Sequence, residues 1–373
     1  MTNKSRNIKK EIKESNKSGC FIRANTYLGP RGYFENILES YYIEKIYIVK
    51  NRCGSYMLNY ILDEIKESKY FPECEYFISP DDLNRIDCLL IKELNTVIIA
   101  ENPGIYNILA KYPLIVENII DFGDFFDENY LLERKEELIS LRNKKNDCNI
   151  LGYKFLNAAN EICENIIRLS HKYIDFDKIN LSVRRLSSKY INEKHLKENI
   201  KKPDRYRFID YISAAGQGET DIYESGAEKI FYITNENDLV WHYTKYIEKQ
   251  FSHLCRTVCS DSLNPERIKA VYLEDFKILF IIKERKDNRI YDEKYNFINM
   301  ERFSSPDFKK ENKQKLKFMK KCRNSLIEEA VKYFKEAEHI NKSIENIYIS
   351  SVNAVKSAEK NKYTEAVIKK ILP

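Results

Sequence analysis

Five short blocks in the first half of this sequence recur, in the same order, in its second half. The block IEKIYIVKN at 43–51 recurs as AEKIFYITN at 227–235. The other four pairs are 79–86 with 259–268, 89–101 with 271–283, 118–125 with 296–303, and 153–162 with 331–340. A repeated order constrains the fold more than any single motif, because each copy must form the same unit.

The repeat predicts two copies of one domain in a chain of 373 residues. We expect the first copy at 19–195 and the second at 204–373. A polar tail (1–18) precedes them, and a charged linker (196–203) that ends in Pro203 separates them.

Each copy alternates predicted strands with predicted helices. The runs at 46–49, 88–91 and 97–99 are almost entirely apolar, which is typical of strands in a sheet covered on both faces. Gly and Pro are scarce, at 10 and 9 residues, which argues against an all-β fold with frequent turns. We therefore predict an α/β protein with mostly parallel sheets.

Long, highly charged segments close each copy. We expect helices near 128–146 and 151–170 in the first copy, and near 306–321 and 325–345 in the second. In each copy, the two helices are predicted to form a long helical hairpin attached to its own sheet.

The segment 46–65 has the order of a phosphate-binding loop. A strand at 46–49 is followed by a polar turn that contains Gly54, and then by a helix at 57–65 with an apolar stripe. The usual pattern G-x-x-x-x-G-K-[ST] would place Lys at Met57 and Ser or Thr at Leu58. An ordinary strand-to-helix turn is the alternative.

Taken in order, these motifs resemble the tandem P-loop ATPase-like proteins of clostridia and bacilli. The resemblance covers nearly the whole chain beyond residue 19. It is carried by GPRG (29–32) and AGQG (215–218), SPDDLN (79–84) and CSDSLN (259–264), LIKEL (90–94), and IIDFGDFFDEN (119–129). It implies two tandem P-loop domains and a nucleotide as ligand.

The resemblance fails where the chemistry should be. The family loop G-x-P-G-T-G-K-S-T falls on NRCGSYMLN (51–59), where only Gly54 and Ser55 match. In the second copy, NENDLVWHY (235–243) matches none of these positions, and Ala100 and Ile282 stand where the magnesium-binding Asp is expected. Loss of the loop Lys alone weakens nucleotide binding by about tenfold to a hundredfold.

Some residues still suit weak binding of a nucleotide or another anion. Asn tolerates the left-handed backbone of a tight loop, and Lys50 and Glu101 lie beside the lost groups. The candidate binding residues are Lys50, Asn51, Gly54, Ser55, Glu101, Asn235 and Asn237. No catalytic residue and no metal ligand is predicted.

Two functional classes follow. The first is a degenerate, non-hydrolysing P-loop-like protein that senses a nucleotide or anion weakly or binds a protein partner. It requires no cofactor, and ATP or another nucleotide is a weak ligand. The alternative is an active ATPase or kinase-like enzyme that uses Lys50 and Glu101 as displaced residues.

Composition limits the partners and the location. The net charge is +6, and basic and acidic residues alternate, so we expect no nucleic acid. The nine cysteines show no disulfide spacing, and neither a signal sequence nor a membrane span is recognisable. We expect a cytoplasmic protein with an unidentified protein partner and no membrane contact.

Overall fold

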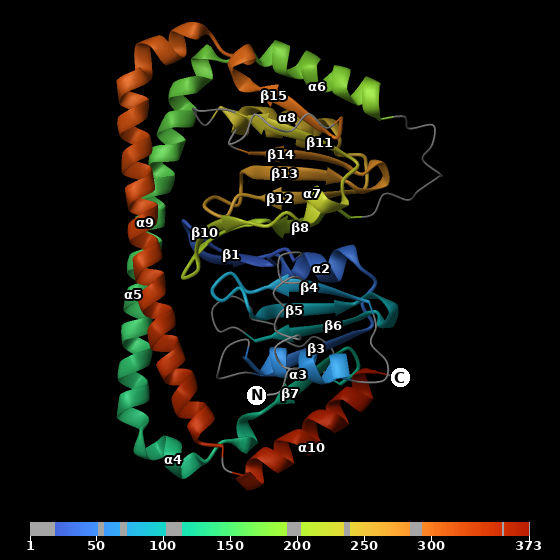
Figure 1. Cartoon of the computed structure of the whole chain (residues 1–373), viewed down its shortest axis with the longest axis vertical. Helices are drawn as coiled ribbons and strands as arrows, with labels where there is room; N and C mark the ends of the chain where they lie inside the picture. Colours follow the sequence, from blue (N-terminus) through green and yellow to red (C-terminus); the bar gives the residue numbers. More distant parts are fainter. Residues whose placement is uncertain are drawn as a thin grey trace.

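The computed structural model describes residues 19–50, 56–67, 73–101, 114–191, 203–234, 239–283, 293–352 and 354–372. The chain is a mixed α/β protein, which confirms the predicted class. Two sheets lie one above the other along the long axis of the molecule, and two long helices run side by side along both of them (Figure 1).

The first sheet has five strands in the order β4-β5-β6-β3-β7. Their bounds are Cys74–Ile78 (β4), Ile86–Ile91 (β5), Thr96–Ala100 (β6), Lys45–Lys50 (β3) and Glu117–Asp121 (β7). Strand β3 pairs in parallel with β6 and β7, whereas β4, β5 and β6 pair antiparallel. The sheet is therefore mixed rather than mostly parallel, because β5 and β6 are joined by a tight turn in which Asn95 adopts the left-handed conformation.

The second sheet repeats this order and adds one strand, giving β15-β11-β14-β13-β12-β8. The bounds are Tyr295–Asn299 (β15), Lys229–Thr234 (β11), Ile278–Ile282 (β14), Ile268–Leu273 (β13), Arg256–Ser260 (β12) and Arg205–Phe208 (β8). Strand β11 pairs in parallel with β14 and β15, as β3 does with β6 and β7. The central strands of the two predicted copies thus occupy equivalent positions in their sheets.

Both faces of the first sheet are covered, as its apolar strands predict. Along β3, Ile46 and Ile48 point to one face, and Tyr47 and Val49 point to the other. Helix α2 (Phe34–Ser40) covers the first face, and α3 (Tyr56–Glu67) covers the second. The corresponding helices of the second half are α7 (Ile222–Gly226) and α8 (Val240–Gln250).

The two sheets meet through a pair of hydrogen bonds between Phe21 and Phe208. Each backbone N–H donates to the carbonyl of the other residue at 2.9 Å. Next to each residue lies a two-stranded hairpin, β1 (Arg23–Thr26) with β2 (Gly29–Gly32), or β9 (Asp210–Ser213) with β10 (Gly216–Glu219). The segments GPRG and AGQG therefore belong to the second strands of these hairpins, and Gly29 and Gly216 supply the positive φ that each hairpin requires.

The predicted helical hairpins are wrong. Helix α4 (Glu128–Glu133) is short, α5 is one helix over Lys135–Ser170, and α9 is one helix over Pro306–Ser350. Neither long helix has Pro in its interior, since Pro306 is the first residue of α9, and the single Gly of α5, Gly152, packs against Phe334 of α9. The two long helices pack against each other instead of folding back, because no residue breaks them and their apolar faces are buried together.

Each long helix carries the chain from one sheet to the other. Helix α5 starts after α4, at the end of the molecule that holds the first sheet, and ends at the second sheet, where α6 (Phe176–Tyr190) packs on α8 (Figure 1). Helix α9 returns to the first sheet, where α10 (Ala354–Ile371) packs on α3 (Figure 1). Each sheet is therefore covered by a helix from the other half, although α6 precedes the linker predicted at 196–203. The domain limits 19–195 and 204–373 stay a prediction.

Candidate functional site

The carboxyl ends of β3, β6 and β7 form one edge of the first sheet. The strands end at Lys50, Ala100 and Asp121, and β3 lies between the other two. From β3 the chain continues to β4 at one margin of the sheet, whereas from β6 it continues to β7 on the other side of β3, so the strand order reverses at this edge. Ligands of α/β proteins bind outside the carboxyl ends of strands at such points.

Two of the predicted binding residues lie together at this edge. Lys50 is exposed at the end of β3, and Glu101 directly follows β6 with a half-buried side chain. The Glu101 N–H donates to the Val49 carbonyl at 2.9 Å, which places the two residues on neighbouring strands. Asn51, Gly54, Ser55, Asn235 and Asn237 lie outside the described residues.

The residues at the positions where the resemblance would place a loop Lys and a Ser or Thr are buried. Met57 is 4% exposed and Leu58 is 0% exposed, and both belong to the core between the sheet, α3 and α10. The next residue, Asn59, holds the β4–β5 connection, since its amide donates to the Asn84 carbonyl and accepts from the Ile86 N–H, both at 2.9 Å. This first turn of α3 is therefore built for packing.

The second sheet has a similar apolar helix start at α8. Leu239 and Val240 are buried, and Val240, Tyr243 and Ile247 face the sheet as Leu58, Ile61 and Ile65 do in α3. In the structure, Val240 is thus equivalent to Leu58. The alignment of segment 235–243 with segment 51–59 placed Val240 opposite Tyr56 instead, and the structure corrects this. Val240 accordingly stands two positions nearer to the end of β11 than Leu58 does to the end of β3.

Two polar residues at the start of α8 have structural partners. The Trp241 ring lies 5.6 Å from the Arg267 guanidinium. His242 Nε2 lies 3.0 Å from the Ser170 hydroxyl, and burial lowers the His242 pKa to about 4.

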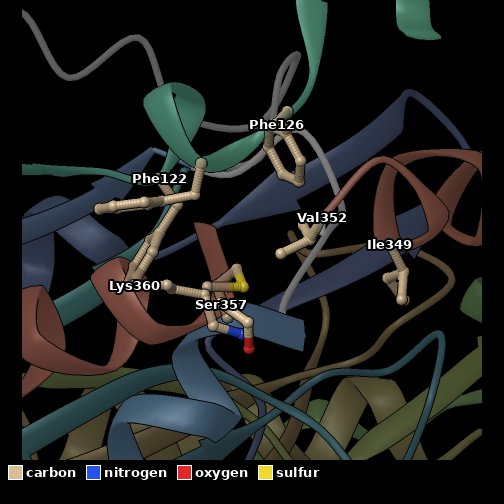
Figure 2. A pocket seen from close by; sticks show the side chains of 8 residues that line it. Phe122, Phe126, Ile349, Val352, Ser357 and Lys360 are labelled. Atoms are coloured by element: carbon tan, nitrogen blue, oxygen red, sulfur yellow. The ribbon is translucent and has the colours of Figure 1, made fainter. Parts of the chain in front are cut away.

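A cavity of about 200 Å³ adjoins Met57 at the edge of the first sheet (Figure 2). Its lining comes from the start of α3, the turn after β7, the end of α9 and the start of α10. Most of these side chains are apolar, and the lining residues are Met57, Phe122, Phe125, Phe126, Ile349, Val352, Ser357 and Lys360. A small concave apolar site with few polar groups is typical of ligand pockets.

Among the described residues, Lys360 is the one cation in the lining of this cavity. Its Nζ lies 4.6 Å from the centre of the Tyr60 ring, and burial lowers the Lys360 pKa. Within the described part of the chain, no carboxylate forms an ion pair with Lys360. The cavity thus combines apolar walls with a partly desolvated positive charge.

An open groove of about 800 Å³ lies on the other side of Phe126, which lines both spaces. Its walls come from the turn after β7, α4, the start of α5 and the end of α9. Lys356 holds the backbone between the cavity and the groove, because its Nζ donates to the carbonyls of Asp124 and Phe126 at 2.8 and 2.9 Å.

The sequence analysis did not identify Ser357 or Lys360 as site residues. A signal was present, since both interrupt the apolar stripe of α10, which continues with Val367 and Ile371. The described residues contain no group of three or more His, Cys, Asp or Glu side chains arranged to hold a metal ion. None of the helices among them is both long and apolar enough to cross a membrane.

No protein-family model matches this chain, and no curated protein or solved structure matches it.

Proposed function

We propose that this protein is a non-hydrolysing binding protein built on two degenerate P-loop-like units, and that it binds its ligand at the carboxyl edge of the first sheet. One observation carries the proposal. Met57 and Leu58, where an active loop has its Lys and its hydroxyl, are buried in the core beneath α10. These residues neither neutralise phosphate charge nor hold Mg²⁺, on which phosphoryl transfer depends.

The rest of the edge supports binding rather than turnover. Ala100 is 3% exposed and Ile282 is 9% exposed, so the position expected for a magnesium-binding Asp is apolar in both halves. In the second half, Lys283 follows β14 and is paired with Glu219 and Glu224. It is therefore engaged within the protein. A weak nucleotide or anion site at Lys50 and the start of α3 remains part of the proposal.

The test separates binding from hydrolysis. Calorimetric titration with ATP and ADP, each with and without Mg²⁺, measures affinity, and phosphate release measures turnover. We expect weak or no nucleotide binding and no phosphate release above a protein-free blank. Mg²⁺-dependent release that is lost in Lys50→Ala or Glu101→Ala would instead establish the displaced-residue enzyme.

A gain-of-function variant tests the ancestry of the loop. Leu58 and Asn59 must be kept, because replacing a fully buried Leu costs about 3 kcal/mol and Asn59 holds the β4–β5 connection. The variant is therefore Tyr56→Gly with Met57→Lys, and Met57→Leu is its control. A folded variant that binds ATP no better than this control would count against a phosphate-loop origin.

A further inference from the structure

The helices α6 and α10 hold equivalent places in the two halves. Each follows a long helix and packs on the helix after the central strand, which is α8 for α6 and α3 for α10. Their inward stripes have the same spacing. The stripe of α6 is Phe176, Ile179, Val183, Leu186 and Tyr190, and that of α10 is Ser357, Lys360, Thr364, Val367 and Ile371.

The first two positions of these stripes differ in chemistry. In the second half, Ile179 is fully buried, and the Phe176 ring packs at 5.6 Å from His242 and 6.4 Å from Tyr246. In the first half, Ser357 and Lys360 stand at these positions and line the cavity of about 200 Å³. The same positions of the stripe therefore carry packed side chains in the second half and border a cavity in the first half.

An open space with a lysine in it lowers stability. A buried Ile-sized side chain would add hydrophobic stabilisation that this space lacks, and a partly desolvated ammonium group adds a further cost. Polar residues at inward helix positions that normally carry packed apolar side chains, with no structural gain, are typical of functional sites. Ser357 and Lys360 have this property.

We infer that this cavity binds a small carboxylate with an apolar body, whose carboxylate pairs with Lys360 and whose body contacts Phe122 and Phe126. This inference rests on the proposal that the first sheet binds a ligand without converting it. The cavity volume sets the size, because cavities of about 150 Å³ accept benzene. One aromatic ring or a short branched chain, together with its carboxylate, fits.

The charge of the ligand follows from the lining. A single cation balances one negative charge, whereas a phosphate dianion would bring an unbalanced charge between apolar walls. A neutral ligand would leave the ammonium group of Lys360 without a counter-charge. The Ser357 hydroxyl offers an additional donor to the carboxylate.

The experiment compares three probes of one shape on the full-length protein. Isothermal titration calorimetry is run with phenylacetate, its neutral counterpart phenylacetamide, and the cation 2-phenylethylammonium. We expect phenylacetate to bind at least about tenfold more tightly than phenylacetamide, because a charge-assisted hydrogen bond contributes about 1.5–3 kcal/mol. The cation is expected to bind least.

Two variants test the inference. One removes the charge of Lys360, and the other introduces the residue type that the second half has at the position equivalent to Ser357. Lys360→Met keeps the length of the side chain and should reduce phenylacetate affinity to that of phenylacetamide. Ser357→Phe places the residue type of Phe176 in the cavity and should abolish binding of all three probes while raising the melting temperature. Lys362→Met, on the exposed side of α10, is the matched control and should change nothing.

The outcomes are distinct. Equal binding of phenylacetate and phenylacetamide to the natural protein, absence of binding by every probe, or a preference that survives Lys360→Met would each overturn the inference. If Lys360→Met fails to fold, as seen by circular dichroism, Lys360→Ile replaces it, since Ile179 is accepted at the equivalent position. Phosphate release from ATP would overturn the proposed function alone, because the carboxylate preference is measured separately.

Discussion

Arg85 and Glu345 join the first sheet to a helix that starts at the second sheet. Arg85 Nη1 and Nη2 donate to Glu345 Oε1 and Oε2 at 2.7 and 2.9 Å. In the second half, Arg267 Nη2 donates to Glu164 Oε1 of α5 at 2.6 Å. Arg85 lies in the connection between β4 and β5, and Arg267 lies in the equivalent connection between β12 and β13. Each long helix thus forms an ion pair with the sheet that it reaches.

The two ion pairs should differ in their contribution to stability. The Glu345 side chain is 4% exposed, whereas that of Glu164 is 49% exposed. Glu345→Ala leaves Arg85 without its main partner and should lower the free energy of unfolding by about 3 kcal/mol. Glu164→Ala should cost less than about 1 kcal/mol, since solvent screens the pair and Arg267 keeps its hydrogen bond to Asn160. Urea denaturation measures the free energy of unfolding of both variants. Equal losses in the two variants would contradict the expected difference between the ion pairs.

Gly152 allows the closest approach of the long helices. A Cβ atom at this position would lie 2.5 Å from the Phe334 ring, which is itself buried. Gly→Ala in a helix normally gains about 1 kcal/mol, but here we expect overpacking to lower stability by about 1–3 kcal/mol. The double variant Gly152→Ala with Phe334→Leu should be more stable than the sum of its single variants predicts. If the changes in melting temperature of the two single variants simply add up in the double variant, the Phe334 ring can move aside.

Glu338 should make stability depend on pH. Burial, with smaller contributions from Asp81 and Glu345, raises its pKa from 4.5 to about 7, against the opposing charges of Lys342 and Arg85. The protonated form is therefore favoured in the folded state. Its stabilising contribution is complete below pH 4.5 and is lost as the pH rises through 7.

Glu338→Gln tests this dependence, because the amide stays neutral. We expect the variant to be more stable than the natural protein at pH 8, by on the order of 2 kcal/mol, and to show a weaker fall in stability between pH 5 and 8. Some dependence should remain, since burial also raises the pKa of Asp210 to about 7. If the free energy of unfolding of the two proteins changes with pH in the same way, Glu338 is not responsible for the pH dependence.

A buried ion pair has opposite polarity in the two halves. Arg23 of β1 pairs with Asp87 of β5, whereas at the equivalent positions Asp210 of β9 lies 3.9 Å from Lys269 of β13. Arg23→Asp should lower stability by about 3 kcal/mol or more, because two buried carboxylates then face each other. Adding Asp87→Lys should restore part of the loss, though not all, since Asp81 stays beside residue 23. A double variant less stable than Arg23→Asp in thermal unfolding would show that the reversal is not tolerated.

Local patterns were sufficient for the strands predicted at 46–49, 88–91 and 97–99 and for the helix predicted at 57–65. The apolar run 46–49 lies within β3, and the stripe at 57–65 lies within α3, because alternation and four-residue spacing report burial directly. The repeat also predicted equivalent positions for β3 and β11. It could not predict the pairing of β5 with β6, which depends on the left-handed Asn95 between them.

The candidate site was only partly predictable. Lys50 and Glu101, two of the predicted binding residues, lie at one sheet edge, because the ends of neighbouring parallel strands meet. The cavity was missed, because its lining comes from α3, the turn after β7, and α9 and α10, which are far apart in the chain. A comparison of the stripes at 176–190 and 357–371 would have identified Ser357 and Lys360 as exceptions.

The sequence by itself determined the α/β class, the repeated order of elements and the apolar faces that each element buries, because these depend on the spacing of neighbouring residues. Only the tertiary structure decided what those faces pack against. The segments predicted as hairpins lack a breaker, so the local pattern does not say whether a helix folds back or crosses to the other sheet. Contacts between distant residues, such as Gly152 with Phe334 and Arg85 with Glu345, favour the crossing. That choice brings α10 over α3 and creates the cavity beside Lys360.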